Sequence, residues 1–248
     1  MSFFSLKSNQ EIFVTNPFGF PLAPRWENYV KAVTRFDIGI FFRNSTIVVI
    51  LSMFFGITFA LMFTYVIARV RNRLTKTLHS VIMLGMFIPI QAVMIPLVVM
   101  VKNLGLINTF WSLIVPYATL SFPFAVMVLY GFYLSLPLEL EESAFIDGAG
   151  FFRTYFSIIF PQMKSAIAVL LIYQFISNWN EFSLALILIT KNNMKTLPLG
   201  LAGFWGAFST DWGPIGASLV IASIPVIILY FFFSSQISDA MTYSGMKN

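Results

Sequence analysis

Four long stretches of this chain contain no charged residue. They cover residues 44–68, 77–101, 103–138 and 212–238. Each is longer than the roughly 20 residues that an α-helix needs to cross about 30 Å of hydrocarbon. Inside a bilayer the backbone must satisfy its own hydrogen bonds, so these stretches are expected to be helical. They are continuous and do not alternate between apolar and polar residues, which argues against a transmembrane β-barrel.

A fifth apolar segment, residues 165–190, contains one acidic side chain, Glu181. Together with the uncharged stretches it predicts an all-α polytopic membrane protein. Membrane lipid is the expected solvent of most of the chain. The five predicted spans lie near residues 44–68, 78–101, 110–134, 165–189 and 213–235.

The composition agrees with a membrane protein and excludes several chemistries. The chain is 58% hydrophobic and 10% charged, whereas a soluble domain has about 25% charged residues. It has no cysteine and one histidine, so neither thiolate chemistry nor a zinc site built on paired histidines is expected. The net charge of +5 does not indicate a nucleic-acid partner, because the basic residues form no single long run.

The orientation follows from the short loop RVRNRLTK, residues 69–76. Short loops rich in Lys and Arg face the cytoplasm. Alternation of the spans then places residues 135–164 and the C-terminus in the cytoplasm, and residues 1–42 and 190–212 outside. An N-terminus outside needs an upstream signal or span, and MSFFSLK is too short for either. Either a leading helix precedes residue 1, which we expect, or the tail is translocated without one.

One short polar segment interrupts the apolar chain, PLELEESAFIDGAGFFRTYFSIIFP at residues 137–161. We predict a helix of about ten residues, with Ser135 or Leu136 as N-cap, Pro137 in the first turn and Gly148 in the left-handed position at the end. Carboxylates suit the positive end of a helix dipole. By itself such a helix fits a polar connector between two spans. The acidic residues are Glu139, Glu141, Glu142 and Asp147.

The spacing within this segment matches a known motif. It runs Glu142-Ser143-Ala144, three residues, Gly148, nine residues, Ile158, one residue and Phe160-Pro161. This resembles the EAA loop of ABC-importer permeases, which reads Glu-Ala-Ala, three residues, Gly, nine, Ile, any residue and Leu-Pro. Ser143 and Phe160 depart from the motif by mild changes. The resemblance implies a type I ABC-importer permease helix bundle (MetI-like).

In that family the short helix docks in a groove of a separate ATPase subunit and transmits its closing to the membrane helices. The chain has no G-x-x-x-x-G-K-[ST] phosphate loop. The resemblance therefore implies a transport subunit without an ATPase site or cofactor of its own, and ATP on a partner dimer. The residues it assigns to ATPase coupling are Glu139, Glu141, Glu142, Ser143, Ala144, Asp147, Gly148 and Pro161.

Other stretches resemble the smaller membrane subunit of the carbohydrate branch, the maltose-transporter type. They include PRWENYVKAV, FRNSTIVV, NWNEF, KTLPLGLAGF, TDWG and SGMKN, so the likeness covers about residues 8–248. It implies a bacterial cell membrane protein with a second, homologous permease chain and an extracytoplasmic sugar-binding protein as partners. Family members have six spans, of which the first is missing here. The expected division is an extracytoplasmic segment 1–42, a permease domain 43–238 with its coupling loop at 135–164, and a cytoplasmic tail 239–248.

Two further groups of residues are candidates for transport itself. Inserting a carboxylate at bilayer depth costs roughly 2.5–3.5 kcal/mol of free energy, so Glu181 is expected to have a structural or functional role. Three roles are open for Glu181. Together with Trp179 and Asn180 it lines or gates a sugar path, or it holds the helix at a bend, or it makes a structural hydrogen bond to a neighbouring helix. In the outer loop, Trp205, Asp211 and Trp212 either meet the binding protein, as the resemblance implies, or anchor the loop at the membrane interface.

Two other classes of protein are the alternatives. An intramembrane enzyme would need a paired nucleophile and base, or two facing carboxylates, and the sequence offers no such pair. A secondary transporter would use inverted repeats and intramembrane charges for ion coupling, and neither is evident. The EAA-type spacing favours the importer, because only that class needs a docking helix at this place.

Overall fold

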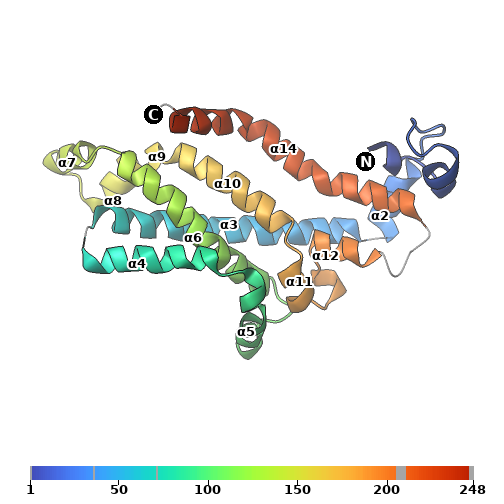
Figure 1. Cartoon of the computed structure of the whole chain (residues 1–248), viewed down its shortest axis with the longest axis horizontal. Helices are drawn as coiled ribbons and strands as arrows, with labels where there is room; N and C mark the ends of the chain where they lie inside the picture. The colour runs from blue at the N-terminus through green and yellow to red at the C-terminus, as the bar shows by residue number, and fades with distance from the viewer. Residues whose placement is uncertain (1, 36, 71, 205–210, 246–248) are drawn as a thin grey trace. The chain divides into compact units, whose positions relative to one another are not determined.

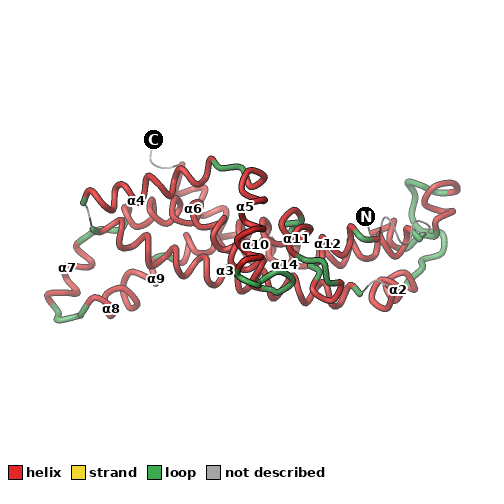
Figure 2. Tube along the Cα trace, turned by 90° about the horizontal axis from the view of Figure 1, so that it is seen from below, coloured by secondary structure: helices red, strands yellow, loops and turns green. Residues whose placement is uncertain are grey.

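The computed structural model in Figure 1 describes residues 2–35, 37–70, 72–204 and 211–245. Throughout these ranges the regular elements are helical, and Figure 2 shows them joined by loops. This confirms the predicted all-α class.

Three single helices are long and apolar enough to cross a membrane: α3 (Ile38–Arg69), α6 (Trp111–Ser135) and α14 (Trp212–Gly245). Two further candidate spans are bent. The first combines α4 (Arg73–Leu84) and η2 (Gly85–Phe87) with α5 (Ile90–Asn103), at an angle of 105°. The second combines residues 151–162 with α10 (Lys164–Trp179), at 68°. The described residues therefore hold up to five spans, the number predicted, if each bent pair is one span.

Two of the predicted spans are interrupted. Helix η2 ends before Ile88, whose backbone is extended, and Pro89 follows. A proline disfavours helical geometry in the residue before it and lacks the N–H that would continue the helix, which accounts for the break. The segment predicted as one helix over 165–189 is also divided, because α10 ends at Trp179 and α11 (Ser183–Leu188) begins three residues after Asn180.

The remaining elements are short. Residues 151–162 comprise α8 (Phe151–Thr154), η3 (Tyr155–Ile159) and α9 (Phe160–Gln162). The others are α1 (Ser2–Ser5), η1 (Glu11–Thr15), α2 (Glu27–Arg35), α7 (Glu139–Ile146), η4 (Asn192–Met194) and α12 (Leu197–Ala202).

The chain forms two compact units. Unit 1 consists of residues 1–50, 98–113 and 176–231. Within it the start of α3 is tied to the predicted outer loop: Asn44 Nδ2 donates to the carbonyls of Asn193 and Lys195 at 2.9 Å, and Leu197 N donates to Ser45 Oγ at 2.8 Å. These bonds join segments about 150 residues apart in sequence, so the loop is part of the folded unit.

Unit 2 consists of residues 51–97, 114–175 and 232–248. Its core is built from apolar side chains of α3, α6, α10 and the segment 151–162, with Leu129, Ile159 and Leu170 fully buried. Tyr133 Oη in α6 donates to the Leu61 carbonyl in α3 at 3.1 Å. This unit contains the polar segment that the sequence singled out.

Candidate functional site

Helix α7, eight residues from Glu139 to Ile146, lies in the loop between α6 and α8. The predicted N-cap is wrong. Helix α6 continues through Ser135, whose hydroxyl donates to the Phe132 carbonyl at 2.8 Å and so belongs to the last turn of α6. Leu138 takes the cap position without a side-chain hydrogen bond, and Pro137 precedes the helix. Glu139, Glu141 and Glu142 fall in the first turn, where carboxylates favour the positive end of the helix dipole.

The end of α7 is as predicted. Gly148 has φ +79°, the left-handed conformation that glycine adopts without a steric penalty. Gly148 N donates to the Phe145 carbonyl at 3.0 Å, and Ala149 N donates to the Ala144 carbonyl at 2.9 Å. This pair of bonds is a Schellman motif, which satisfies carbonyls that the helix end would otherwise leave without partners. The space where a Gly148 side chain would project is open.

A buried ion pair fastens α7 to the end of α3. Arg69 Nε donates to Glu141 Oε1 at 2.6 Å, and Tyr65 Oη donates to Glu141 Oε2 at 2.9 Å. The side chains of Arg69 and Glu141 are 11% and 10% exposed. Arg69 also donates to the Leu136 carbonyl at 3.4 Å. Sequence reasoning grouped Glu141 with the solvated acids and Arg69 with the loop, so it missed this contact.

The aromatic residues around this ion pair extend it into the core of unit 2. The ring of Tyr65 lies 4.8 Å from that of Tyr155 and 5.6 Å from those of Tyr133 and Phe151, measured between centroids. The hydroxyls of Tyr133 and Tyr155 are 3.4 Å apart. Helix α7 is therefore connected through Glu141 to α3, and through Tyr65 to α6, α8 and η3.

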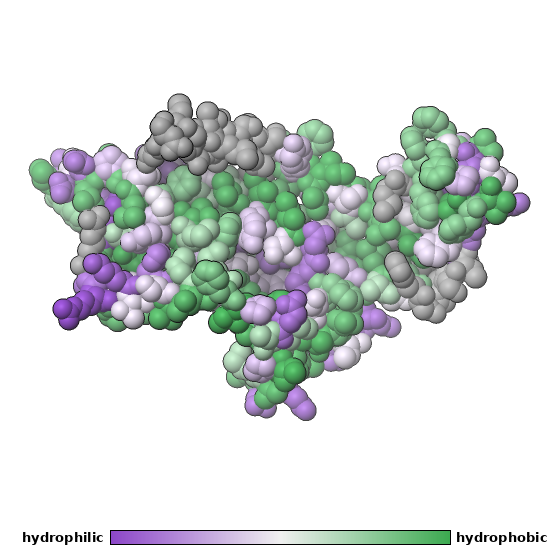
Figure 3. Space-filling view, in the orientation of Figure 1, coloured by the Kyte–Doolittle hydropathy of each residue, from purple (hydrophilic) through white to green (hydrophobic). Residues whose placement is uncertain are grey.

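The opposite side of α7 faces outward. Ile146 is 86% exposed and Phe145 is 50% exposed. Figure 3 shows hydrophobic and hydrophilic side chains together over this helix. Of the predicted coupling residues, Ala144 is buried, Glu141 forms the internal pair, and Pro161 is half-buried in the first turn of α9. The exposed ones are Glu139, Glu142, Ser143, Asp147 and Gly148.

The second predicted group lies in unit 1, where α10 ends. Glu181 accepts hydrogen bonds from Leu184 N at 2.8 Å and Ala185 N at 3.3 Å, so its carboxylate caps the start of α11. Of the roles considered for Glu181, this geometry fits holding the chain at a bend. The carboxylate satisfies backbone donors that the break leaves open.

Trp179 and Asn180 border a cavity of about 390 Å³ in unit 1, and Glu181 does not. The buried Trp179 donates from Nε1 to the Ala222 carbonyl at 3.1 Å, and its ring packs edge-on against Phe42. The Asn180 amide donates to the Ile176 carbonyl at 2.8 Å. The other residues that line the cavity are Leu197, Pro198, Leu201, Leu219, Ala222, Ser223, Val226 and Ile227.

The third group contacts the N-terminal segment within unit 1. Asp211 pairs with Lys31 at 3.7 Å. Trp212 N donates to Asn9 Oδ1 at 2.8 Å, and the Trp212 ring lies edge-on to Phe13. Trp205 lies outside the described residues. The two described members are thus held by residues near the start of the chain.

The part of the chain that the structure describes contains no cluster of three or more His, Asp or Glu side chains suited to a metal ion. The only histidine in the sequence, His79, lies beside Tyr130 with ring centroids 4.2 Å apart.

The sequence of this chain is similar to those of known transport proteins. Residues 52–243 match the model of the binding-protein-dependent transport system inner membrane component. The chain is 36% identical to the multiple sugar-binding transport system permease protein MsmG of Streptococcus mutans, over 99% of this chain and 89% of that protein. It is 33% identical to the diacetylchitobiose uptake system permease protein NgcG of Streptomyces coelicolor, over 98% and 81%.

The fold also matches a solved structure. The crystal structure of a bacterial ABC transporter involved in the import of the acidic polysaccharide alginate contains a chain that aligns with a TM-score of 0.83. The alignment covers 94% of this chain and 87% of that chain, at 21% sequence identity. At this identity the likeness concerns the fold.

Proposed function

Since this chain belongs to the family of binding-protein-dependent transport system inner membrane components and is a multi-pass transport subunit, we propose that α7 couples it to the ATPase of a sugar importer. ATP is bound and hydrolysed by a dimer of partner subunits. A second, homologous permease chain completes the membrane path, and an extracytoplasmic binding protein delivers the sugar.

One observation carries the coupling role: α7 has an exposed side suited to docking and a buried side fastened to the core. Exposed apolar side chains such as Ile146 and Phe145, rimmed by polar residues, are typical of protein–protein contacts. Glu139, Glu142 and Asp147 add negative charge that suits a basic rim on the partner. The bonds at Gly148 fix the end of this short helix and the Arg69–Glu141 pair fixes its buried side, so it moves as one body.

The buried side supplies the mechanical connection. When the ATPase dimer closes, α7 moves with it, and the Arg69–Glu141 pair moves the end of α3. Removing one partner of a buried ion pair costs about 3–5 kcal/mol, so α7 and α3 move together. The membrane helices then alternate between outward- and inward-open states. This role places α7 and the C-terminus in the cytoplasm.

The cargo of this chain is a sugar or oligosaccharide. Two related permeases support this, because their names describe a diacetylchitobiose uptake system and a multiple sugar-binding transport system. Trp179 and Asn180 line the path at the cavity in unit 1, because an aromatic face and an amide are groups that bind sugars. Glu181 maintains the break beside them. The outer loop with Trp205, Asp211 and Trp212 contacts the binding protein.

Uptake by the reconstituted complex tests this function. Proteoliposomes with both permease chains, the ATPase subunits and the binding protein are offered labelled diacetylchitobiose and a panel of other oligosaccharides. Accumulation of at least one of them is expected only with internal ATP and with the binding protein outside. Uptake that persists without ATP and collapses with the ion gradient would instead identify a secondary transporter.

A further inference from the structure

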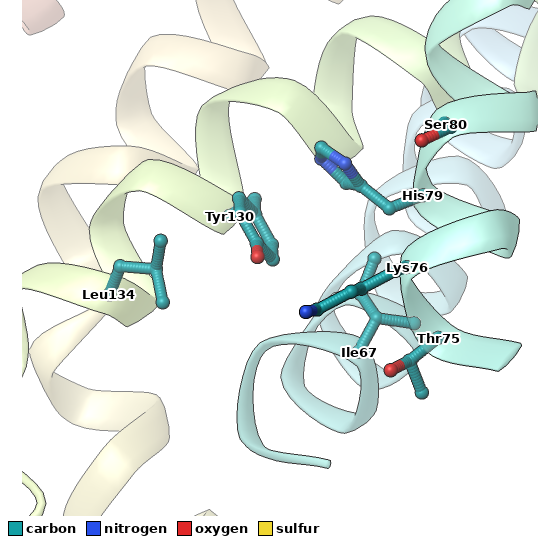
Figure 4. Close-up of a pocket in the computed structure, with 7 residues that line it drawn as sticks. All are labelled: Ile67, Thr75, Lys76, His79, Ser80, Tyr130 and Leu134. Atoms are coloured by element: carbon teal, nitrogen blue, oxygen red, sulfur yellow. The ribbon is translucent and has the colours of Figure 1, made fainter. Parts of the chain in front are cut away.

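A polar pocket of about 540 Å³ opens in unit 2 between α4 and α6 (Figure 4). Lys76, His79 and Ser80 reach it from α4, and Tyr130 and Leu134 from α6. Thr75 and Ile67 complete its lining. The function proposed above makes no use of this pocket.

Except for Thr75, whose hydroxyl donates to the Val70 carbonyl, the polar side chains of the pocket have no hydrogen-bond partner among the described residues. These side chains are Lys76, His79, Ser80 and Tyr130, which form neither a hydrogen bond nor an ion pair with any residue that the structure describes. His79 and Tyr130 pack ring against ring, with centroids 4.2 Å apart, which holds both side chains in place. Figure 4 shows the amino group of Lys76 directed into the space that these residues surround.

The charge of the pocket selects the ligand. One lysine lines it and no carboxylate does, among the residues that the structure describes. Its donors therefore suit a phosphate, whereas the ammonium group of a zwitterionic lipid would have no counter-charge there. Basic pockets between transmembrane helices on the cytoplasmic side are typical sites for anionic headgroups.

The surroundings of the pocket suit a lipid tail. Met127 and Leu134 of α6 are exposed and lie on the same helix face as Tyr130, so this helix presents an apolar stripe beside the pocket. Asn72 caps α4 by accepting from Thr75 N at 2.8 Å, which fixes the first turn that carries Lys76. Figure 3 shows a hydrophilic patch where α4 begins. Polar donors next to an apolar stripe match a headgroup joined to acyl chains.

We propose that this pocket binds the phosphate of an anionic phospholipid, with Lys76 and Tyr130 as its main contacts. The test measures the phospholipid that the full chain retains after purification in mild detergent, together with its partner subunits, from membranes containing equal phosphatidylglycerol and phosphatidylcholine. Native mass spectrometry counts the bound lipid. The wild type is expected to retain phosphatidylglycerol in preference to phosphatidylcholine.

Variants locate the site. Lys76→Gln is expected to lower retained phosphatidylglycerol about tenfold, and Tyr130→Phe, which keeps the ring against His79, about fivefold. Lys102→Gln, an exposed lysine in the last turn of α5, is the matched control and should retain wild-type levels. Equal retention of phosphatidylglycerol by wild type and Lys76→Gln would overturn the proposal. So would a wild type that retains no phosphatidylglycerol but binds inorganic phosphate, which would identify free phosphate as the ligand.

Discussion

Replacing Gly148 by aspartate is expected to leave the chain in the membrane and to reduce ATP-driven sugar uptake about 100-fold. The backbone at Gly148 is left-handed, with φ +79°, and aspartate adopts this conformation more readily than most residues. No atom lies within 4 Å of the added Cβ, so the chain itself accommodates it. The new side chain and charge instead occupy the surface that we propose docks on the ATPase. Uptake in proteoliposomes and membrane-fraction yield are measured together.

The matched control is Gly105→Asp. Gly105 is also exposed, has φ +69°, and has no atom near the added Cβ, but it lies in residues 102–109, which alternation of the predicted spans puts on the outer side. Its uptake should stay within about twofold of wild type, because exposed substitutions away from a contact change little. Gly148→Asn, similar in size without the charge, separates obstruction from repulsion. Wild-type uptake by Gly148→Asp, or an equal loss in Gly105→Asp, would contradict the coupling role.

The second large effect is expected from Glu141→Gln, which leaves Arg69 buried without its counter-charge. This substitution should destabilise the chain by about 3 kcal/mol, since an unpaired buried charge is costly. The docking surface with Ile146 is unchanged, so the ATPase should still bind. Because α7 is no longer fastened to α3, the number of sugars transported per ATP hydrolysed should fall about tenfold. Thermal unfolding in detergent and the ratio of uptake to hydrolysis measure the two effects.

Two further variants distinguish the effect of losing the buried ion pair from the effect of removing a negative charge from α7. Glu139→Gln removes an exposed carboxylate from the same helix and should change stability by less than about 0.5 kcal/mol. The double variant Arg69→Met/Glu141→Leu replaces both charges by apolar groups and should recover most of the stability, as such replacements often do. If Glu141→Gln keeps both the unfolding temperature and the coupling ratio of the wild type, the proposed connection between α7 and α3 is wrong.

The helical spans and the end of α7 were predictable because both depend on local sequence. Uncharged runs longer than a bilayer crossing can only be helical in hydrocarbon, which accounts for α3, α6 and α14. The turn at Gly148 follows from the conformational freedom of glycine after a short acidic helix. The start of α7 was mispredicted because hydrophobicity does not indicate that α6 continues to Ser135.

The tertiary contacts were not predictable in the same way. Hydropathy identified 78–101 and 165–189 as apolar but did not distinguish straight helices from bent ones, although Pro89 is a local signal for the first break. Glu141 and Arg69 are 72 residues apart in the sequence, and their pairing depends on how the end of α3 packs against α7. No single-sequence periodicity indicates which of three neighbouring glutamates is buried.

The most direct test of the central claim is a site-specific cross-link from α7. The chain has no cysteine, so Ile146→Cys introduces a single reactive thiol at an 86% exposed position. A membrane-permeant photoactivatable maleimide is attached in native membranes, and the cross-linked partner is identified by mass spectrometry. Phe13→Cys, exposed on the N-terminal segment, is the control. The account predicts an ATP-binding subunit joined to position 146 and none joined to position 13. An actively transporting complex in which position 146 reaches no ATP-binding subunit would contradict it.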